Sequence, residues 1–223
     1  MKPLADCRLY AFVDTAYLNG RTPEFIAQQL CAGGADLIQL RAKELAVEEI
    51  RAIAEAILPI TKRANVGLVI NDHLSVAQQV GAELCHLGQE DFFGLGNRAV
   101  SELFDARGAD VPGRLQIGLS THSPEQAEKA LAAGADYIAI GPVYATGTKP
   151  TAKPVRLDYV RWAAANVRIP WFAIGGINLN NVDEVLAAGA KRICVVSAIL
   201  NCDDIARTAR EYKKRLEPAS RSL

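Results

Sequence analysis

Short apolar runs alternate with longer helix-like segments along the whole chain. Runs suited to buried strands begin near Leu9, Leu37, Leu68, Leu84, Leu115, Tyr137, Pro170 and Arg192. The segments between and after them predict helices at 22–32, 46–64, 73–80, 98–107, 123–133, 156–166, 179–188 and 203–216. Continuous apolar strands that alternate with helices indicate a parallel sheet covered by helices. Eight such units predict an α/β fold with a single (β/α)8 TIM-barrel domain over residues 1–223, and a doubly wound open sheet is the alternative.

A short glycine-containing phrase recurs between the predicted helices and strands. It reads AGGAD at 32–36, VGAEL at 80–84, AAGADY at 132–137 and AAGAKR at 187–192. The shared glycine is typical of a helix C-cap in the left-handed conformation, which glycine adopts at little cost. The repeating unit is therefore a helix, a glycine cap and a strand.

The composition of the chain argues against some classes of binding partner. The chain has 223 residues, 50% of them hydrophobic, and a formal net charge of zero, which argues against nucleic-acid or membrane partners recruited by bulk charge. The N-terminal stretch lacks the apolar core of a signal peptide and no run is long enough for a membrane span, so we expect a cytoplasmic protein. The five cysteines form no CxxC motif, and packing is the expected role of Cys85 and Cys194. Oligomeric state stays open, a homo-oligomer included.

Polar residues collect where seven of the predicted strands end, which is where barrel enzymes carry their active sites. These segments are QLRAK (39–43), INDH (70–73), HLGQED (86–91), GLSTH (118–122), GPVYATGTK (141–149), IGGI (174–177) and VVSAI (195–199). A random surface would scatter such residues over both faces of the fold. The pattern therefore predicts one site at the carboxyl ends of the strands, with small-molecule substrates.

Four of these segments are suited to binding anions. The 141–149 loop combines glycines, two threonines and Lys149, which suits phosphate, although its order is not that of a Walker A loop. Arg41 and Lys43 are two residues apart, so on an extended strand both side chains leave the same face, and together they suit a diphosphate. The segments Gly175-Gly176 and Val196-Ser197 follow strands 7 and 8, the usual phosphate site of these barrels.

Two carboxylates, Asp72 and Asp91, follow the adjacent strands 3 and 4. Neighbouring strands lie about 4.8 Å apart, so both could reach one Mg²⁺, which prefers one or two carboxylates together with waters and substrate phosphate oxygens. The alternative reading is that Asp72 caps a helix and Asp91 serves a turn. His73 and His122 lie just past strand ends, His86 lies within strand 4 where a core role is expected, and the roles of all three stay open.

With these motifs in this order, the chain resembles the thiamine phosphate synthase family from Leu9 to Ile199; HLGQED and the T-x-T-K loop are the specific motifs. The resemblance implies that a pyrimidine diphosphate, 4-amino-2-methyl-5-(diphosphooxymethyl)pyrimidine, is joined to 4-methyl-5-(2-phosphooxyethyl)thiazole with release of diphosphate. It implies Mg²⁺ at Asp72 and Asp91 and catalytic roles for Arg41, Lys43, Lys149 and Ser120. The substrate-binding residues it implies are Gln39, Leu40, Arg41, Ala42, Lys43, Asn71, Ser120, Thr146, Gly147, Thr148, Lys149, Gly176, Val196 and Ser197. His73 and Cys85 depart slightly from the family pattern.

The residues support the mechanism that the resemblance implies, which is a dissociative displacement. Cations and a divalent metal would neutralise the departing diphosphate, and the thiazole nitrogen would attack the pyrimidine methylene without a covalent enzyme nucleophile. Two rivals stay open. A thiazole tautomerase on the same barrel would use a histidine such as His122 for proton transfer, and a non-catalytic sensor of phosphorylated ligands would need neither paired carboxylates nor two anion sites.

Overall fold

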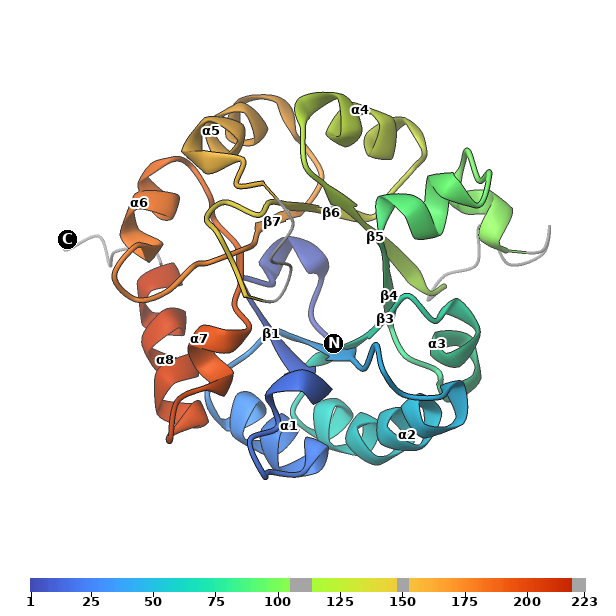
Figure 1. Cartoon of the computed structure of the whole chain (residues 1–223), viewed down its shortest axis with the longest axis vertical. Helices are drawn as coiled ribbons and strands as arrows, with labels where there is room; N and C mark the ends of the chain where they lie inside the picture. The colour runs from blue at the N-terminus through green and yellow to red at the C-terminus, as the bar shows by residue number, and fades with distance from the viewer. Residues whose placement is uncertain (105–113, 148–152, 218–223) are drawn as a thin grey trace.

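The protein is a closed barrel of eight parallel strands in the order β1 to β8, surrounded by helices (Figure 1). The structure, a computed structural model, describes residues 1–104, 114–147 and 153–217. The strands are β1 Leu9–Asp14, β2 Leu37–Arg41, β3 Gly67–Asn71, β4 Leu84–Leu87, β5 Gln116–Thr121, β6 Tyr137–Ile140, β7 Trp171–Ala173 and β8 Ile193–Cys194. The prediction of a (β/α)8 barrel is confirmed, and the open-sheet alternative is wrong because β1 pairs with β8.

The outer layer consists of helices that follow the strands in chain order. The α-helices are α1 Pro23–Ala32, α2 Val47–Arg63, α3 Leu74–Val80, α4 Pro124–Ala132, α5 Arg156–Asn166, α6 Val182–Ala187, α7 Ser197–Leu200 and α8 Ile205–Leu216. Side chains cap three of them, because Thr22, Ser123 and Asp204 each accept a hydrogen bond from a first-turn backbone N–H. The recurring glycines Gly34, Gly81, Gly134 and Gly189 all have positive φ, so the predicted left-handed caps are confirmed.

The number of paired residues differs between neighbouring strands of the barrel. Five residue pairs join β1 to β2, whereas β7 and β8 share the single pair Ala173↔Ile193. β8 contains only two residues and is joined to β1 by two pairs. The seam between β7 and β8 is therefore the least extensively paired part of the barrel.

Aromatic side chains fill the barrel interior. The Tyr10 ring stacks on Phe12 at 5.3 Å between centroids and meets Phe172 edge-on at 5.3 Å. Tyr137 enters from the other side, and a Cβ added at Gly118 would lie 2.0 Å from its ring. Glycine on β5 therefore makes room for tyrosine on β6, and this aromatic layer forms the floor beneath the site described below.

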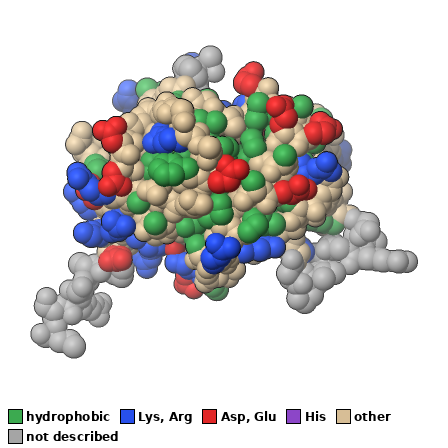
Figure 2. Space-filling view, turned by 90° about the horizontal axis from the view of Figure 1, so that it is seen from below, with side chains coloured by type: hydrophobic (Ala, Val, Ile, Leu, Met, Phe, Trp, Pro, Cys, Tyr) green, Lys and Arg blue, Asp and Glu red, His purple; other side chains and the backbone are tan. Residues whose placement is uncertain are grey.

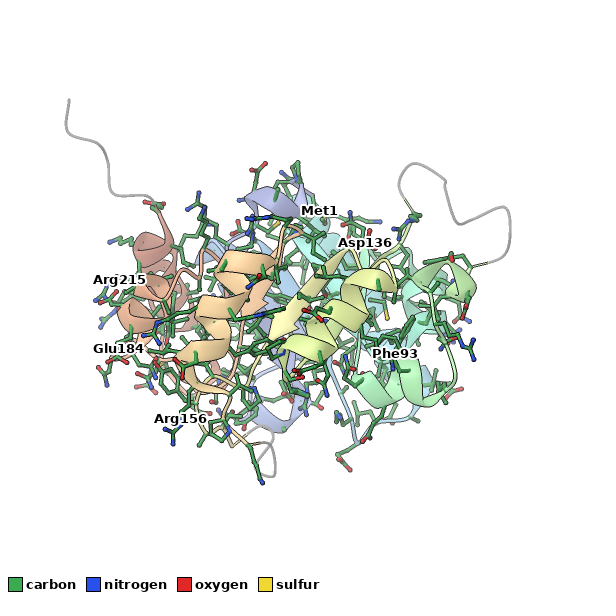
Figure 3. All side chains as sticks on the ribbon, turned by 90° about the horizontal axis from the view of Figure 1, so that it is seen from above. Met1, Phe93, Asp136, Arg156, Glu184 and Arg215 are labelled. Atoms are coloured by element: carbon green, nitrogen blue, oxygen red, sulfur yellow. The ribbon has the colours of Figure 1, made fainter. Side chains whose placement is uncertain are left out.

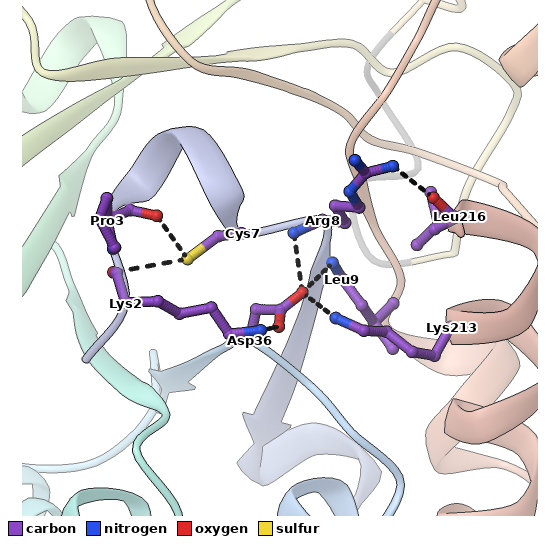
Figure 4. A network of polar contacts seen from close by, with 8 residues as sticks. All are labelled: Lys2, Pro3, Cys7, Arg8, Leu9, Asp36, Lys213 and Leu216. Carbon is purple, nitrogen blue, oxygen red and sulfur yellow. Dashed lines mark hydrogen bonds and ion pairs between the residues drawn. The ribbon is translucent and has the colours of Figure 1, made fainter. Parts of the chain in front are cut away.

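The amino-terminal face is closed by the 3-10 helix η1, Leu4–Asp6, and by a network around Asp36 (Figure 4). The Asp36 side chain is 1% exposed and accepts hydrogen bonds from the ammonium groups of Lys2 and Lys213. It also accepts from the backbone N–H groups of Arg8 and Leu9, at 2.8 and 3.0 Å. One carboxylate thus joins both ends of the described chain to β1 and β2.

Two parts of the predicted secondary structure are wrong. A helix was expected over 98–107, but η4 is a short 3-10 helix, Val100–Leu103, and Phe104 is extended; residues 105–107 lie outside the described range. The Val100 N–H donates to the carbonyl of Ala133 in another element, and this tertiary contact replaces a helical one. The segment 195–199 was expected to continue strand 8, yet β8 ends at Cys194 and Ser197 begins α7.

The surface carries charges of both signs in alternation with apolar side chains on the face seen in Figure 2. No helix within the described ranges is long and apolar enough to cross a membrane. Figure 3 places Met1 and Asp136 at one end of the barrel and Arg156, which begins α5, at the other. The two faces of the barrel therefore carry different residues, and the site lies on the face where the strands end.

Candidate active site

A cavity of about 520 Å³ opens at the carboxyl ends of the strands. Its size falls within the usual range for small-molecule sites. Nine of the predicted substrate-binding residues line it: Gln39, Arg41, Asn71, Ser120, Thr146, Gly147, Gly176, Val196 and Ser197. They come from all sides of the barrel, so the strand-end pattern in the sequence corresponds to one space in the structure.

Five predicted residues lie beside this cavity without lining it: Leu40, Ala42, Lys43, Asp72 and Asp91. Leu40 lies between Gln39 and Arg41 on β2, so by strand alternation its side chain faces the helical layer, where it is 1% exposed. Thr148 and Lys149 lie outside the described residues.

Arg41 and Lys43 contact different carboxylates. The Arg41 guanidinium donates to Asp14 across the end of β1, with Nη1 2.8 Å from Oδ2. β2 ends at Arg41, so Lys43 lies in the following turn and its Nζ is 4.0 Å from Oδ2 of Asp72. The expectation that both cations leave one face of an extended strand is therefore wrong, because the strand stops before Lys43.

Asp14 contacts a predicted site residue and was missed by the sequence reasoning. It ends β1, its side chain is 1% exposed, and it holds Arg41 while accepting a hydrogen bond from the Ala16 N–H at 3.0 Å. The available signal was its place at the end of the first apolar run, equivalent to the other strand ends. Pairing with Asp14 fixes the guanidinium at the cavity wall and balances its charge.

A hydrogen-bonded chain crosses the cavity floor. The Gln39 amide donates to the Tyr10 hydroxyl at 2.6 Å, and Tyr10 and Tyr137 hydroxyls lie 3.2 Å apart. His86 Nδ1 is 3.2 Å from the Tyr137 hydroxyl, and its Nε2 is 2.9 Å from Ser120 Oγ. Burial raises the pKa of both tyrosines, so they stay neutral near pH 7. If the Tyr10 hydroxyl donates to Tyr137 and the Tyr137 hydroxyl donates to Nδ1 of His86, then Nε2 of His86 carries the hydrogen and donates to Ser120 Oγ. The hydroxyl hydrogen of Ser120 is then left to donate to a ligand.

The structure shows what surrounds each of the three histidines. His86 lies in β4, is 7% exposed and has partners on both ring nitrogens, as expected of a satisfied core histidine, but it also lines the cavity. His122 lines the cavity as well, and its Nδ1 contacts the carbonyl of Gly141. His73 precedes α3 and makes no side-chain cap to that helix.

The loops after β6 and β7 are interlocked at the cavity wall. Val143 and Tyr144 N–H groups donate to the carbonyls of Ile174 and Gly175, at 2.8 and 3.0 Å. A Cβ on Gly176 would lie 2.6 Å from the Ala145 carbonyl oxygen, and Gly176 also has φ of 64°. Glycine is therefore required at position 176 by the close approach of two backbones.

The two predicted metal ligands follow the adjacent strands β3 and β4. The Asp72 N–H donates to the His86 carbonyl on β4 at 2.9 Å. Asp91, in the π-helix η3 (Glu90–Gly94), folds back so that a Cβ added to Gly88 would lie 2.5 Å from its Oδ2. The N-cap residue of α3 is His73, whose side chain makes no cap bond.

These carboxylates fit the chemistry of a magnesium ion. Both are hard oxygen donors near the end of β4, and Lys43 and Asn71 already contact Asp72. Within the described ranges, no group of three or more His, Cys, Asp and Glu side chains could enclose a metal. That is compatible with Mg²⁺, which takes one or two carboxylates and fills its other positions with water and phosphate oxygens.

Comparison with known proteins agrees with this geometry. The family described as thiamine monophosphate synthase matches residues 9–199. The chain belongs to the thiamine monophosphate synthase family. It is 43% identical over 190 residues to the thiamine-phosphate synthase of Thermus thermophilus, which covers 85% of this chain and 86% of that protein. The corresponding protein of Acidothermus cellulolyticus is 42% identical over 220 residues, with 97% and 98% covered.

A solved structure of the same family has the same fold. Thiamine phosphate pyrophosphorylase from Pyrococcus furiosus superposes with a TM-score of 0.80 at 28% identity, covering 94% of this chain and 95% of that one. The predictions of a barrel of this family and of a transferase enzyme are confirmed by these matches. The matched residues 9–199 include the nine predicted residues that line the cavity and both carboxylates.

Proposed function

We propose that this enzyme joins 4-amino-2-methyl-5-(diphosphooxymethyl)pyrimidine to 4-methyl-5-(2-phosphooxyethyl)thiazole and releases diphosphate, forming thiamine phosphate. One observation carries the proposal: a single cavity has Arg41 and Asn71 on one side and Gly176, Val196 and Ser197 on another. Two anion-suited walls around one space call for two phosphorylated ligands. The names of the relatives support the same conclusion.

The pyrimidine diphosphate would bind at the ends of β2 to β4. Arg41, held by Asp14, presents donors to the diphosphate, and guanidinium groups bind phosphate oxygens in pairs. Asn71 and Lys43 stand beside it, and Lys149 is proposed to contact the same group. Asp72 and Asp91 would hold Mg²⁺, which when bound stabilises charge on a departing diphosphate.

The ring of the pyrimidine would lie over the floor of the cavity. Gln39 and Ser120 have their side chains fixed by Tyr10 and His86, so their remaining hydrogen-bonding groups are oriented before substrate arrives. Preorganised polar groups of this kind lose little entropy on binding. The thiazole phosphate would take the backbone amides around Gly176 and Ser197, with Thr146, Gly147 and Thr148 covering it.

The chain's residues then promote bond cleavage without forming a covalent intermediate. Arg41, Lys43 and Lys149 stabilise the negative charge that grows as diphosphate leaves, since at about 4 Å and an effective dielectric near 20 one charge pair is worth roughly 4 kcal/mol before desolvation. The two bound rings are held in one cavity, so the thiazole nitrogen attacks the methylene carbon as an intramolecular reaction would.

The decisive test is incubation of the purified protein with both substrates and Mg²⁺, followed by assays for diphosphate and thiamine phosphate. We expect both products in equal amounts, and none without either substrate. Asp91→Asn should lack activity, whereas Asp158→Asn, which removes a carboxylate that is 90% exposed, should retain it. Failure to form thiamine phosphate, or full activity in excess chelator, would refute the proposal.

The tautomerase alternative has one observation in its favour, because His122 lines the cavity. Its Nδ1 is engaged by Gly141, which leaves Nε2 for proton transfer. Incubation with the thiazole phosphate tautomer alone separates the two activities. Conversion that needs no pyrimidine diphosphate and is lost in His122→Ala would support the tautomerase.

A further inference from the structure

The amino-terminal face carries a fourfold pattern that is broken at one position. The triplet glycine-alanine-acid precedes β2, β4 and β6, and places Asp36, Glu83 and Asp136 at this face. Each carboxylate accepts a backbone N–H from the preceding strand: from Leu9 at 3.0 Å, from Leu68 at 3.1 Å and from Ile117 at 2.7 Å. The repeat thus supplies one anion for each of the first three strand pairs.

Basic side chains balance two of these anions. Asp36 binds Lys2 and Lys213, and Asp136 binds both terminal nitrogens of Arg114 at 2.9 and 2.7 Å. In the fourth repeat, Gly189-Ala190-Lys191, a lysine stands where the acid is expected. The last strand pair, β7 and β8, therefore has a cation in place of its anion.

A second cavity, of about 280 Å³, lies at this fourth position. It is lined by Ala5, Ala164, Val167, Arg168, Ile169, Pro170, Trp171, Gly189, Lys191 and Arg192. Three of these residues are basic, and no described acidic residue is among them. None of the three forms an ion pair with a carboxylate of the described residues. The cavity is remote from the active site, because it lies at the opposite ends of the strands.

Arg192 shows that this cluster contains a buried donor without a partner. Its Nε is buried and has no hydrogen-bond partner among the described atoms, while Nη2 contacts the Ala5 carbonyl. Burial lowers the pKa of Arg192 most and the positive charge of Arg8 lowers it further, and these two effects outweigh Cys7 and Asp6, which raise it. A buried donor without a partner is costly, and an anion in the cavity would provide the missing acceptor.

We propose that this cavity is a binding site for a multiply charged oxyanion of the phosphate class. The anion takes the place of the carboxylate that the fourth repeat lacks, and Arg168, Lys191 and Arg192 bind it. Arginine favours phosphate because its planar donors match two oxygens at once. Three cations around one cavity suit an anion that carries more than one charge. The site is independent of the catalytic cavity and of the reaction proposed above.

Tryptophan fluorescence can report on this cavity alone. The chain has two tryptophans, and Trp171 lines the cavity. Trp162→Phe leaves Trp171 as the reporter. Inorganic phosphate is titrated into this protein at constant ionic strength, with chloride as the monovalent comparison and diphosphate and a small phosphate monoester as further arms. We expect a saturable response to phosphate and none to chloride; the other arms show whether a free anion or an esterified one binds more tightly.

Variants at the repeat position make the test specific. Lys191→Gln and Arg168→Gln in the Trp162→Phe background should each weaken phosphate binding at least about tenfold, which is the loss of one charge-assisted contact. Lys62→Gln is the matched control, since Lys62 is an exposed lysine in the last turn of α2. Lys191→Asp restores the acid of the other repeats and should abolish the response.

Two results would overturn the proposal. A Trp171 signal that does not respond to phosphate would show that the cavity binds no such anion. An undiminished response in Lys191→Gln and Arg168→Gln would show that the signal comes from phosphate in the catalytic cavity. Circular dichroism on each variant confirms that the compared proteins are folded.

Discussion

Replacing Asp36 by asparagine removes a buried charge that binds both ends of the chain. The substitution preserves the size of the side chain and leaves one carbonyl oxygen for the N–H groups of Arg8 and Leu9. It removes the charge that holds the ammonium groups of Lys2 and Lys213 (Figure 4). The closure of the amino-terminal face should therefore weaken while the carboxyl-terminal cavity keeps its shape.

The expected cost follows from how exposed the partners are. Breaking a buried ion pair by removing one member costs about 3–5 kcal/mol. Here Lys2 and Lys213 are 39% and 21% exposed, so both can turn toward water, and only Asp36 is fully buried. We therefore expect Asp36→Asn to lower the free energy of unfolding by about 2–3 kcal/mol, which is a fall in Tm of roughly 4–12 °C for a chain of this length.

The pH dependence of this effect has a definite sign. Burial opposes ionisation of Asp36, but hydrogen bonds from Lys2, Lys213 and two backbone N–H groups outweigh it, so its pKa lies below the usual 3.8. A carboxyl with a lowered pKa stabilises the fold above its unfolded value and loses that contribution as pH falls through its folded value. The difference between wild type and Asp36→Asn should be constant near neutral pH and shrink below about pH 4.

Urea denaturation of both proteins across this pH range measures the effect. Asp158→Asn is the control, because the Asp158–Arg161 pair is exposed and should contribute less than about 0.5 kcal/mol. A cost for Asp36→Asn no larger than that of Asp158→Asn would refute the reasoning, as would a difference that grows on acidification. Activity per folded molecule should match wild type, since no residue of the network lines the active-site cavity.

Three further predictions concern the active site. Asp91→Asn should abolish Mg²⁺-dependent turnover while circular dichroism stays unchanged, and full turnover would contradict the metal assignment. Arg41→Gln should lower kcat/KM by about 10–100-fold. It should also destabilise the fold by roughly 3 kcal/mol, because Asp14 is left buried without its partner. The double variant Arg41→Gln/Asp14→Asn should recover stability in urea but not activity, and failure to recover stability would show that the pair does not couple. Lys149→Ala should cost several kcal/mol of transition-state stabilisation, about the scale of one lost charged contact to a leaving group, and near-normal kcat/KM would remove that residue from the mechanism.

The parts of the fold that follow from local chemistry were predictable from the sequence. Glycine after a helix predicts a left-handed cap, because other residues adopt that conformation at a cost. The structure has this cap at all four predicted positions, Gly34, Gly81, Gly134 and Gly189. The barrel followed from the count of alternating units. Gathering of Gln39 and other polar residues at one cavity followed from the parallel direction of the strands.

Other features depend on contacts that local sequence does not encode. Whether Lys43 continues the face of Arg41 depends on where β2 stops, and element ends are set by tertiary pairing. Asp14 resembles any acid at the end of a strand until Arg41 is placed opposite it. The π-helix that carries Asp91 has no local signature, because its hydrogen-bonding pattern is a rare variant of the α-helix.

The single residue pair between β7 and β8 has a consequence for how this barrel opens. A barrel with one sparsely hydrogen-bonded strand pair should open locally at that pair first, since local opening begins where the pairing is weakest. The Ala173 N–H donates to the Arg192 carbonyl across this strand pair, so solvent deuterium should enter the Ala173 amide before those of the β1–β2 ladder. Because Gly176 and Ser197 follow these two strands, a phosphorylated ligand bound to both would hold β7 and β8 together and slow that exchange.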